Sequence, residues 1–318
     1  MRVLIEKYIP FLQGVLEPYA DVCYVAPDGF TPSSVRDADA LIVRTRTRVD
    51  GALLEGSRVR FVATATIGYD HIDTAYCQRH GIVWTACPGC NAQAVCDYVE
   101  EAMDTLAAVC PPSSVVGVVG HGHVGSLVAA MARRHEHEVL VCDPPLGIGV
   151  GLDEIACRCD MITFHTPLTM EGEYKTFHMV DAAFLQRCKP GVVLMNTARG
   201  GVVDEEALIR YKQSAKGKDM HIVVDCWERE PHINTELLSL VDIGSYHIAG
   251  YSLAGKMCAS EMCLQALCRF FGLPALSIDK KSVPLQGDSS QGWLQRVSQQ
   301  LKERPEAFEQ LRKQYRLR

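Results

Sequence analysis

The chain has 318 residues, of which 47% are hydrophobic and 22% charged, and its formal net charge is −6 at pH 7. This length exceeds one ordinary core and predicts two domains of roughly 150 residues each. The acidic balance argues against a general nucleic-acid-binding protein, because phosphate contacts need clustered positive charge. Glu6 and Lys7 interrupt the first apolar run before it resembles a signal peptide, so we expect a cytoplasmic protein.

The first ninety residues alternate short apolar runs with stretches of helical spacing. We expect strands at 2–5, 41–43 and 60–64, and a helix from Tyr8 to Tyr19. A long helix is expected to begin at 91 and to end near 110, where two prolines follow.

The next part of the chain contains longer runs without polar alternation. Five runs are expected to be strands buried on both faces of a parallel sheet: 115–119, 138–142, 161–165, 192–196 and 222–225. Helices between them form repeated βαβ units. An apolar helix is predicted at about 252–271, and a last charged helix near 305–315. The fold class expected is α/β, with two Rossmann-like, doubly wound parallel-sheet domains and a short C-terminal extension.

The loop after the run at 115–119 carries the spacing Gly120-x-Gly122-x-x-Gly125. The bare pattern is weak, but here it follows a predicted strand and opens a predicted helix, as in a dinucleotide-binding loop. Asp143 ends the next strand, where a carboxylate accepts hydrogen bonds from ribose hydroxyls and repels a 2′-phosphate. The pattern therefore predicts NAD rather than NADP. A glycine-rich turn beside a solvated Asp143 is the alternative. The loop residues expected at the cofactor are Gly120, Gly122, His123, Val124 and Gly125.

Three chemically suitable side chains follow later strand ends. Arg199 lies in "NTARGG", acidic residues lie in "DCWEREP", and His247 lies in "SYHIAG". This set suits oxidation of a 2-hydroxy acid: an arginine grips the carboxylate, a histidine takes the hydroxyl proton, and a carboxylate orients the histidine. Each residue alone is more often structural, and the combination with the cofactor loop favours catalysis.

In their order along the chain, these motifs resemble the D-isomer-specific 2-hydroxyacid dehydrogenases. "ATATIGYDHID", "PGCNAQAV", "TFHTPL" and "DIGSYHIAGYSLAGK" add to a resemblance that covers about 1–272. It implies Arg199 and Glu230 as catalytic residues and His247 as the acid/base, with Glu228 as the fallback carboxylate. It further implies NAD contacts at Asp143, Thr166, Asp225 and Gly250, and substrate contacts at Thr45, Thr66 and Tyr251.

The resemblance also implies an organisation into domains. We expect a substrate-binding domain at 1–90, completed by 251–272, and an NAD-binding Rossmann domain at 91–250. Residues 273–318 would form a shortened C-terminal dimerisation segment, so a homodimer is expected.

The stretch "ALIVRTRTRVD" alternates three arginines with two threonines. The resemblance is closer to a family member whose substrate carries a carboxylate and a phosphate, and such a substrate needs positive charge at both ends. We expect Arg44 and Thr45 to face the ligand where the strand turns, and Arg46 and Arg48 to face solvent.

Alternatives remain for the function. A relative that oxidises 3-phosphoglycerate has the same chemistry, and a protein that senses NAD without turnover keeps the fold. Cys87 and Cys90 have the spacing of a dithiol redox site, although no thioredoxin-like pattern surrounds them. No catalytic metal is expected, because hydride transfer uses the nicotinamide.

Overall fold

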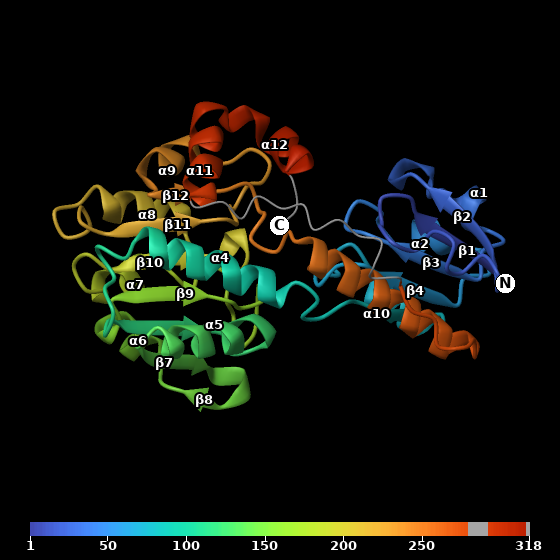
Figure 1. Cartoon of the computed structure of the whole chain (residues 1–318), viewed down its shortest axis with the longest axis horizontal. Helices are drawn as coiled ribbons and strands as arrows, with labels where there is room; N and C mark the ends of the chain where they lie inside the picture. Colours follow the sequence, from blue (N-terminus) through green and yellow to red (C-terminus); the bar gives the residue numbers. More distant parts are fainter. Residues whose placement is uncertain (279–291, 316–318) are drawn as a thin grey trace. The chain divides into compact units, whose positions relative to one another are not determined.

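The computed structural model describes residues 1–278 and 292–315 and divides the chain into two compact units (Figure 1). Unit 1 consists of Met1–Asn91 and Ser252–Leu285. Unit 2 consists of Ala92–Tyr251 and Gln286–Arg318. Within the described residues, no helix combines the length and the apolar character that crossing a membrane requires.

Unit 1 contains a five-stranded parallel sheet in the order β2-β1-β3-β4-β5. Its strands are β1 (Arg2–Glu6), β2 (Asp21–Val25), β3 (Ala40–Val43), β4 (Phe61–Thr64) and β5 (Val83–Thr85). Its helices are η1 (Pro27–Gly29), α1 (Pro32–Val35), α2 (Gly51–Leu54), α3 (Thr74–Arg79) and α10 (Leu253–Phe271). β3 and β4 are buried along their whole length, and α10 packs against β4. The C-terminal half of the chain thus completes the N-terminal core.

The predicted helix at Tyr8–Tyr19 is wrong, because the structure has consecutive turns there. Pro10 lacks the N–H that a helix interior needs, and Phe11 and Gly14 have left-handed φ angles of 67° and 82°. Ile9, Leu12 and Leu16 are nevertheless buried. Their spacing correctly indicated burial but not conformation.

Unit 2 contains a seven-stranded sheet in the order β12-β11-β10-β9-β6-β7-β8, parallel except for the edge strand β8. Its strands are β6 (Val115–Val119), β7 (Glu138–Asp143), β8 (Ile148–Gly149), β9 (Met161–Phe164), β10 (Val193–Asn196), β11 (His221–Val224) and β12 (Ile243–Gly244). All eight strands predicted for the two domains are present. The β6–β9–β10 centre is almost fully buried, as continuous apolar runs require.

Helices cover both faces of this sheet (Figure 1). α4 and α5 pack together, and α6, α7, α8 and α9 contact one another in series. They are α4 (Ala92–Thr105), α5 (His123–Arg134), η2 (Pro144–Leu146), α6 (Leu152–Arg158), α7 (Ala182–Arg187), η3 (Gly200–Val202), α8 (Glu205–Lys212) and α9 (Thr235–Leu240). Together with the parallel sheet of unit 1, this arrangement confirms the predicted α/β fold class.

Residues 292–315, the last that the structure describes, belong to unit 2 and form α11 (Trp293–Glu303), η5 (Pro305–Ala307) and α12 (Phe308–Gln314). α11 was not expected from the sequence. It packs against β12, and its Ser298 hydroxyl accepts the Gly244 N–H at 3.0 Å. Leu294, Leu301 and Phe308 are fully buried. This segment is therefore part of the core of unit 2.

Candidate active site

The loop between β6 and α5 has the tight geometry of a nucleotide-binding turn. Gly120 has a φ of 89°, and its N–H donates to the carbonyl of Cys142 at 2.8 Å. A Cβ on Gly125 would lie 1.8 Å from the Gly120 carbonyl oxygen, so only glycine fits there. A Cβ on Gly122 would meet nothing within 4 Å, which leaves open space at the start of the helix.

The same loop is tied to the end of β7. Asp143 Oδ2 accepts the N–H of His121 at 2.7 Å, and Oδ1 accepts that of Leu146 at 3.3 Å. No side chain caps the first turn of α5, where unpaired N–H groups favour an anion. The Nδ1 atom of His121 is buried and has no hydrogen-bond partner among the described residues. These features fit a dinucleotide, with its pyrophosphate at the helix start and its ribose near Asp143.

Three other residues predicted at the cofactor, His123, Val124 and Thr166, lie in or next to this loop. The methyl group of Thr166 would lie 3.1 Å from a Cβ on Gly120, so the start of the loop after β9 touches the glycine turn. Val124 packs partly against the core, whereas His123 is exposed. Their contacts with NAD remain predictions.

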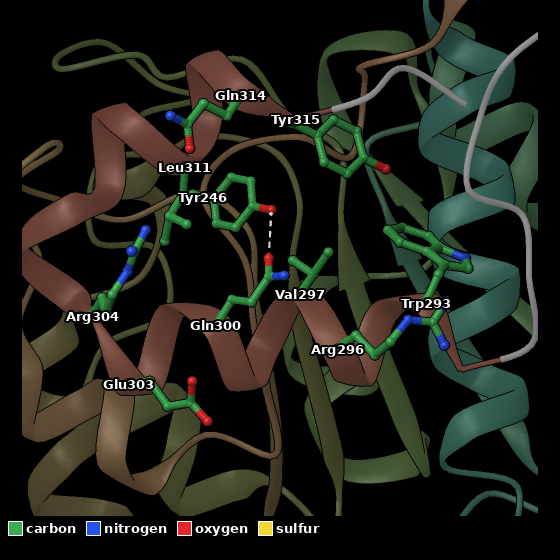
Figure 2. Close-up of a pocket in the computed structure, with 10 residues that line it drawn as sticks. All are labelled: Tyr246, Trp293, Arg296, Val297, Gln300, Glu303, Arg304, Leu311, Gln314 and Tyr315. Atoms are coloured by element: carbon green, nitrogen blue, oxygen red, sulfur yellow. Dashed lines mark hydrogen bonds between the residues drawn. The ribbon is translucent and has the colours of Figure 1, made fainter.

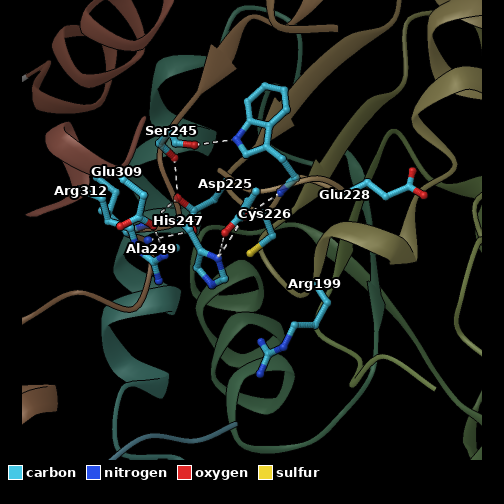
Figure 3. Close-up of polar contacts among 12 residues, drawn as sticks. Arg199, Asp225, Cys226, Glu228, Ser245, His247, Ala249, Glu309 and Arg312 are labelled. Carbon is cyan, nitrogen blue, oxygen red and sulfur yellow. Dashed lines mark hydrogen bonds and ion pairs between the residues drawn. The ribbon is translucent and has the colours of Figure 1, made fainter. Parts of the chain in front are cut away.

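Glu230 follows β11, and His247 follows β12, where Figure 3 shows it near Asp225 and Cys226. Nδ1 of His247 is 2.8 Å from Oε2 and 3.0 Å from Oε1 of the Glu230 carboxylate. Oε1 of Glu230 also accepts the N–H of Trp227 at 2.9 Å, which holds the carboxylate in place. Since Nδ1 is engaged, Nε2 is the ring nitrogen left for proton exchange with a ligand.

The pair shifts the pKa of both groups. Burial raises the pKa of Glu230, but the hydrogen bond and charge of His247, the Trp227 N–H and the charge of Arg312 lower it further, so the net shift is downward. Burial lowers the pKa of His247, but contacts with Cys226 and Glu230 raise it well above its usual value. A histidine poised to hold a proton next to an ionised carboxylate is suited to acid/base chemistry.

Asp225 shapes the loop that carries His247. Its two carboxylate oxygens accept the N–H groups of Ile248 and Ala249 at 2.8 and 2.9 Å, and the hydroxyl of Ser245 donates to it at 2.6 Å. His247 has a left-handed φ of 60°, which costs about 1 kcal/mol or more for a residue with a side chain. Asp225 therefore holds a strained turn that aims the imidazole. Its predicted contact with NAD is not among these interactions and stays a prediction.

Arg199 follows β10 and is the N-cap residue before η3. The loops after β10 and β11 approach closely, because a Cβ on Gly200 would lie 1.9 Å from the Trp227 carbonyl oxygen. The Arg199 guanidinium donates to the carbonyl of Ala198 at 2.8 Å. Among the described residues no carboxylate forms an ion pair with it. The remaining N–H groups of the guanidinium are thus available to an anionic ligand.

Glu228, the fallback carboxylate, points elsewhere. Its Oε1 lies 3.1 Å from Nε2 of His178, and its N–H donates to Glu205 at 2.8 Å. Glu230 is the carboxylate that contacts His247. Since both acids lie within "WEREP", their spacing along the chain left this choice open.

Two neighbours of the pair were missed by sequence reasoning. Cys226 lies beside Glu230 and His247 and is buried. Arg312, in α12, donates its Nε–H to the hydroxyl of Tyr251 at 3.0 Å and lies over its ring, 5.5 Å from the centroid. Cys226 follows Asp225 in the motif "DCWEREP", but the motif does not indicate where its thiol points, and Arg312 is far from the other site residues along the chain.

The predicted substrate residues of unit 1 follow β3 and β4. The chain turns directly after Val43, and the buried carboxylate of Glu6 accepts the N–H of Arg44 at 3.0 Å. Thr45 is exposed, and Thr66 donates to the carbonyl of Gly68 at 2.9 Å. Arg46 and Arg48 are exposed, as expected.

Lys256, in the first turn of α10, lies close enough to Arg44 to respond to its charge. Burial, with the positive charge of Arg44, lowers the pKa of Lys256 to about 8. Two like charges held together in this way favour a bound anion. Lys256 was not identified from the sequence.

The surroundings of Cys87 and Cys90 do not favour a reactive dithiol site. Cys87 is buried, with its Sγ 3.2 Å from the carbonyl oxygen of Ala259. Burial raises the pKa of Cys90 to about 12, which disfavours the reactive thiolate. All fourteen cysteines are free thiols.

A cavity of about 520 Å³ lies elsewhere in unit 2, between Tyr246 and the helices α11 and α12 (Figure 2). The hydroxyl of Tyr246 is 3.5 Å from Oε1 of Gln300 on its wall. None of the predicted catalytic, cofactor or substrate residues lines this cavity. This cavity is therefore separate from the candidate active site.

Comparison with known proteins defines the class. The family model described as "D-isomer specific 2-hydroxyacid dehydrogenase, NAD binding domain" matches residues 100–245. In fold, the chain resembles a 3-phosphoglycerate dehydrogenase of Entamoeba histolytica with bound NAD+, at a TM-score of 0.73 and 22% identity, covering 86% of this chain and 95% of that one.

Closer relatives give the particular family. An erythronate-4-phosphate dehydrogenase of Bacteroides fragilis is 44% identical, covering 100% of this chain and 97% of the relative. An erythronate-4-phosphate dehydrogenase of Chromohalobacter salexigens is 41% identical, covering 93% of this chain and 78% of the relative. The chain belongs to the erythronate-4-phosphate dehydrogenase family, within the D-isomer-specific 2-hydroxyacid dehydrogenases. It is an NAD-dependent dehydrogenase, and the resemblance seen in the sequence is confirmed.

Proposed function

We propose that this protein oxidises 4-phospho-D-erythronate to 2-oxo-3-hydroxy-4-phosphobutanoate with NAD, in the biosynthesis of pyridoxal 5′-phosphate (vitamin B6). The carrying observation is the Glu230–His247 pair, at 2.8 Å, in the same unit as a dinucleotide-binding loop. The identity of 44% with an enzyme named for this substrate supports the choice within the family.

The proposed chemistry assigns one role to each side chain. Arg199 grips the substrate carboxylate and polarises the oxygen on C2. Nε2 of His247 takes the proton of the C2 hydroxyl, and Glu230 stabilises the imidazolium that results. Bound NAD supplies the acceptor for the hydride that leaves C2. The reverse steps return the proton from His247 to the oxygen when a 2-oxo acid is reduced.

The cofactor and substrate contacts are also proposals. NAD would be held by the glycine loop with His123 and Val124, by Asp143, and by Thr166, Asp225 and Gly250. Thr45, Thr66 and Tyr251 would contact the substrate. Arg44 is the candidate contact for the substrate phosphate, and Lys256, close enough to Arg44 for their charges to interact, is a second candidate.

A substrate panel tests the function. Purified protein with NAD is expected to oxidise 4-phospho-D-erythronate with a kcat/KM well above that for 3-phosphoglycerate or unphosphorylated erythronate. Activity confined to 3-phosphoglycerate would reassign the substrate. Binding of NADH without reduction of any 2-oxo acid would favour a sensor.

Lys256→Met tests the phosphate contact. Loss of one cation is expected to raise KM for 4-phospho-D-erythronate at least about tenfold, with little change for the unphosphorylated acid. Lys7→Met, at an exposed lysine of the same unit, is the matched control. Equal effects on both substrates would remove Lys256 from the phosphate site.

We further propose a cytoplasmic homodimer. Abundant free thiols suit a reducing compartment, and the C-terminal segment is the candidate for the dimer contact. Light scattering on the full chain tests the oligomeric state. A monomeric mass at micromolar concentration would refute the proposed homodimer.

A further inference from the structure

Three unlike ligand groups converge at the acid/base pair. One ligand atom each from Cys226, Glu230 and His247 lies within 4.8 Å of the other two. They come from two loops, after β11 and after β12. In the described part of the chain, this is the sole group of three such side chains close enough to share a metal ion. The proposed reaction uses Glu230 and His247 and leaves the thiol without a role.

We propose that Cys226, Glu230 and His247 form a binding site for a thiophilic divalent cation such as Zn²⁺, and that the bound ion inhibits the dehydrogenase reversibly. The inhibition rests on the proposed function, whereas the binding does not. Thiolate, imidazole and carboxylate are the three groups that bind zinc in proteins, and three protein ligands leave a fourth position for water.

The cluster needs little rearrangement to accept the ion. Zinc bonds of about 2.0–2.3 Å place neighbouring ligand atoms roughly 3–4 Å apart. The His247 nitrogen and the Glu230 oxygen now share a hydrogen bond of 2.8 Å, so the ion would replace the proton between them and open this contact slightly. Cys226 Sγ is 3.5 Å from the carbonyl oxygen of Ala198, and the thiol loses this weak contact when it turns toward the ion.

Supporting contacts hold two of the ligands in position. The Trp227 N–H fixes the Glu230 carboxylate at 2.9 Å. Asp225 fixes the backbone on the C-terminal side of His247 through the N–H groups of Ile248 and Ala249. Such hydrogen bonds around metal ligands strengthen binding, because less freedom is lost when the ion enters.

Occupation of this site blocks proton transfer in both directions. With the ion on Nδ1, the one remaining ring proton is on Nε2. The imidazole then has no free electron pair to accept the proton of the substrate hydroxyl. Reduction fails as well, because donating that proton would leave an imidazolate. The ion also neutralises Glu230, which no longer stabilises an imidazolium.

Zinc titration of the NAD-dependent reaction tests the inhibition. Micromolar Zn²⁺ is expected to inhibit the unmodified enzyme, and excess chelator to restore the rate. Cys226→Ser keeps the size of the side chain and removes the thiolate, so the inhibitory concentration should rise at least about tenfold relative to that variant's own uninhibited rate. Cys157→Ser, at an exposed thiol of the same unit, is the control and should behave like the unmodified protein.

Cobalt binding provides a readout without activity. Co²⁺ added to the full chain should produce a thiolate-to-metal charge-transfer band that is absent in Cys226→Ser and in Cys226→Ala and retained in Cys157→Ser. A band that persists in both Cys226 variants overturns the site, as does zinc sensitivity unchanged in Cys226→Ser. If the Cys226-dependent band forms in a protein inactive on every hydroxy acid, the proposed function fails and the metal site stands.

Discussion

At the scale of single residues, the site depends on a backbone conformation that histidine rarely adopts. His247 has a φ of 60°, and Asp225 compensates by accepting two successive N–H groups of the same turn. The imidazole then meets Glu230 through Nδ1. The strained backbone of His247, the hydrogen bonds of Asp225 and the carboxylate of Glu230 together determine which ring nitrogen is available for proton transfer.

Replacing His247 with alanine should abolish catalysis but not cofactor binding. We expect kcat to fall at least about 10²-fold, because general acid/base catalysis is lost. NADH affinity, measured by fluorescence titration, should stay within about twofold. His135→Ala removes a surface histidine that also contacts a glutamate, at 2.7 Å from Glu100, and should leave both quantities unchanged. Normal turnover in His247→Ala would dismiss the assignment.

His165 predicts how the stability of unit 2 depends on pH. Burial lowers its pKa to about 3 from an ordinary value near 6.5, and its Nε2 lies 3.0 Å from the hydroxyl of Thr163. Because the unfolded chain takes up this proton more readily, stability is complete above pH 6.5 and decreases as pH falls toward 3. The slope is about 1.4 kcal/mol per pH unit for one such group.

Urea unfolding between pH 7 and pH 4 checks this prediction. His165→Asn cannot titrate, so its free energy of unfolding should decrease less steeply with falling pH than that of the unmodified protein. His135→Asn, at an exposed position, should keep the original slope. Identical slopes for the unmodified protein and His165→Asn would show that His165 is not the group responsible.

At the scale of elements, α12 carries a side chain to the candidate active site. Arg312 contacts Tyr251, and its positive charge is one cause of the lowered pKa of Glu230. Glu309, one turn earlier in the helix, forms an ion pair with Arg312, with 3.3 Å between Oε1 and Nη1. A segment predicted for dimerisation thus also supports the residues around His247.

Arg312→Met should therefore impair catalysis without unfolding the protein. Methionine preserves the apolar stem but removes the charge and the hydrogen bond to Tyr251. We expect a several-fold rise in KM for 4-phospho-D-erythronate and a smaller change in kcat, and Arg312→Lys should recover part of the loss. Lys313→Met, at the next residue of α12, serves as the control. Unaltered steady-state constants in Arg312→Met would leave this arginine a purely structural role.

The elements also show which sequence patterns were reliable. Buried parallel strands were predicted because both faces are apolar, and the structure has all of them. The turns at 8–20 were mistaken for a helix, because buried apolar residues recur there at a helical interval. α11 was missed because glutamine and charged residues dominate its composition, although Trp293, Leu294, Val297 and Leu301 form a buried face.

At the scale of the whole molecule, the two units have separate cores and separate sets of candidate residues. The proposed cofactor residues all lie in unit 2, whereas Arg44, Thr45 and Thr66 lie in unit 1. Neither unit is one continuous piece of chain, since α10 completes unit 1 and the C-terminal helices complete unit 2.

Cofactor binding should consequently stabilise unit 2 more than unit 1. NADH at about one hundred times its Kd adds about 2.7 kcal/mol to the free energy of unfolding of the part that binds it. Hydrogen exchange should show slower exchange in β6, α5 and β7, and a smaller effect in β1 and β3. Equal slowing in both units would indicate that they unfold as one.

The sequence alone determined the dinucleotide loop, the parallel-strand runs and the family, because glycine spacing and apolar runs are local properties that can be read directly along the chain. The family resemblance had already favoured Glu230 over Glu228. Only the tertiary structure decided that Glu230 contacts Nδ1 of His247, that Asp225 holds the turn, and that Arg312, Lys256 and Cys226 lie beside candidate ligand-binding residues. These contacts join residues brought together by the packing of loops at strand ends or of distant helices. No spacing along the chain encodes the direction in which such side chains finally point.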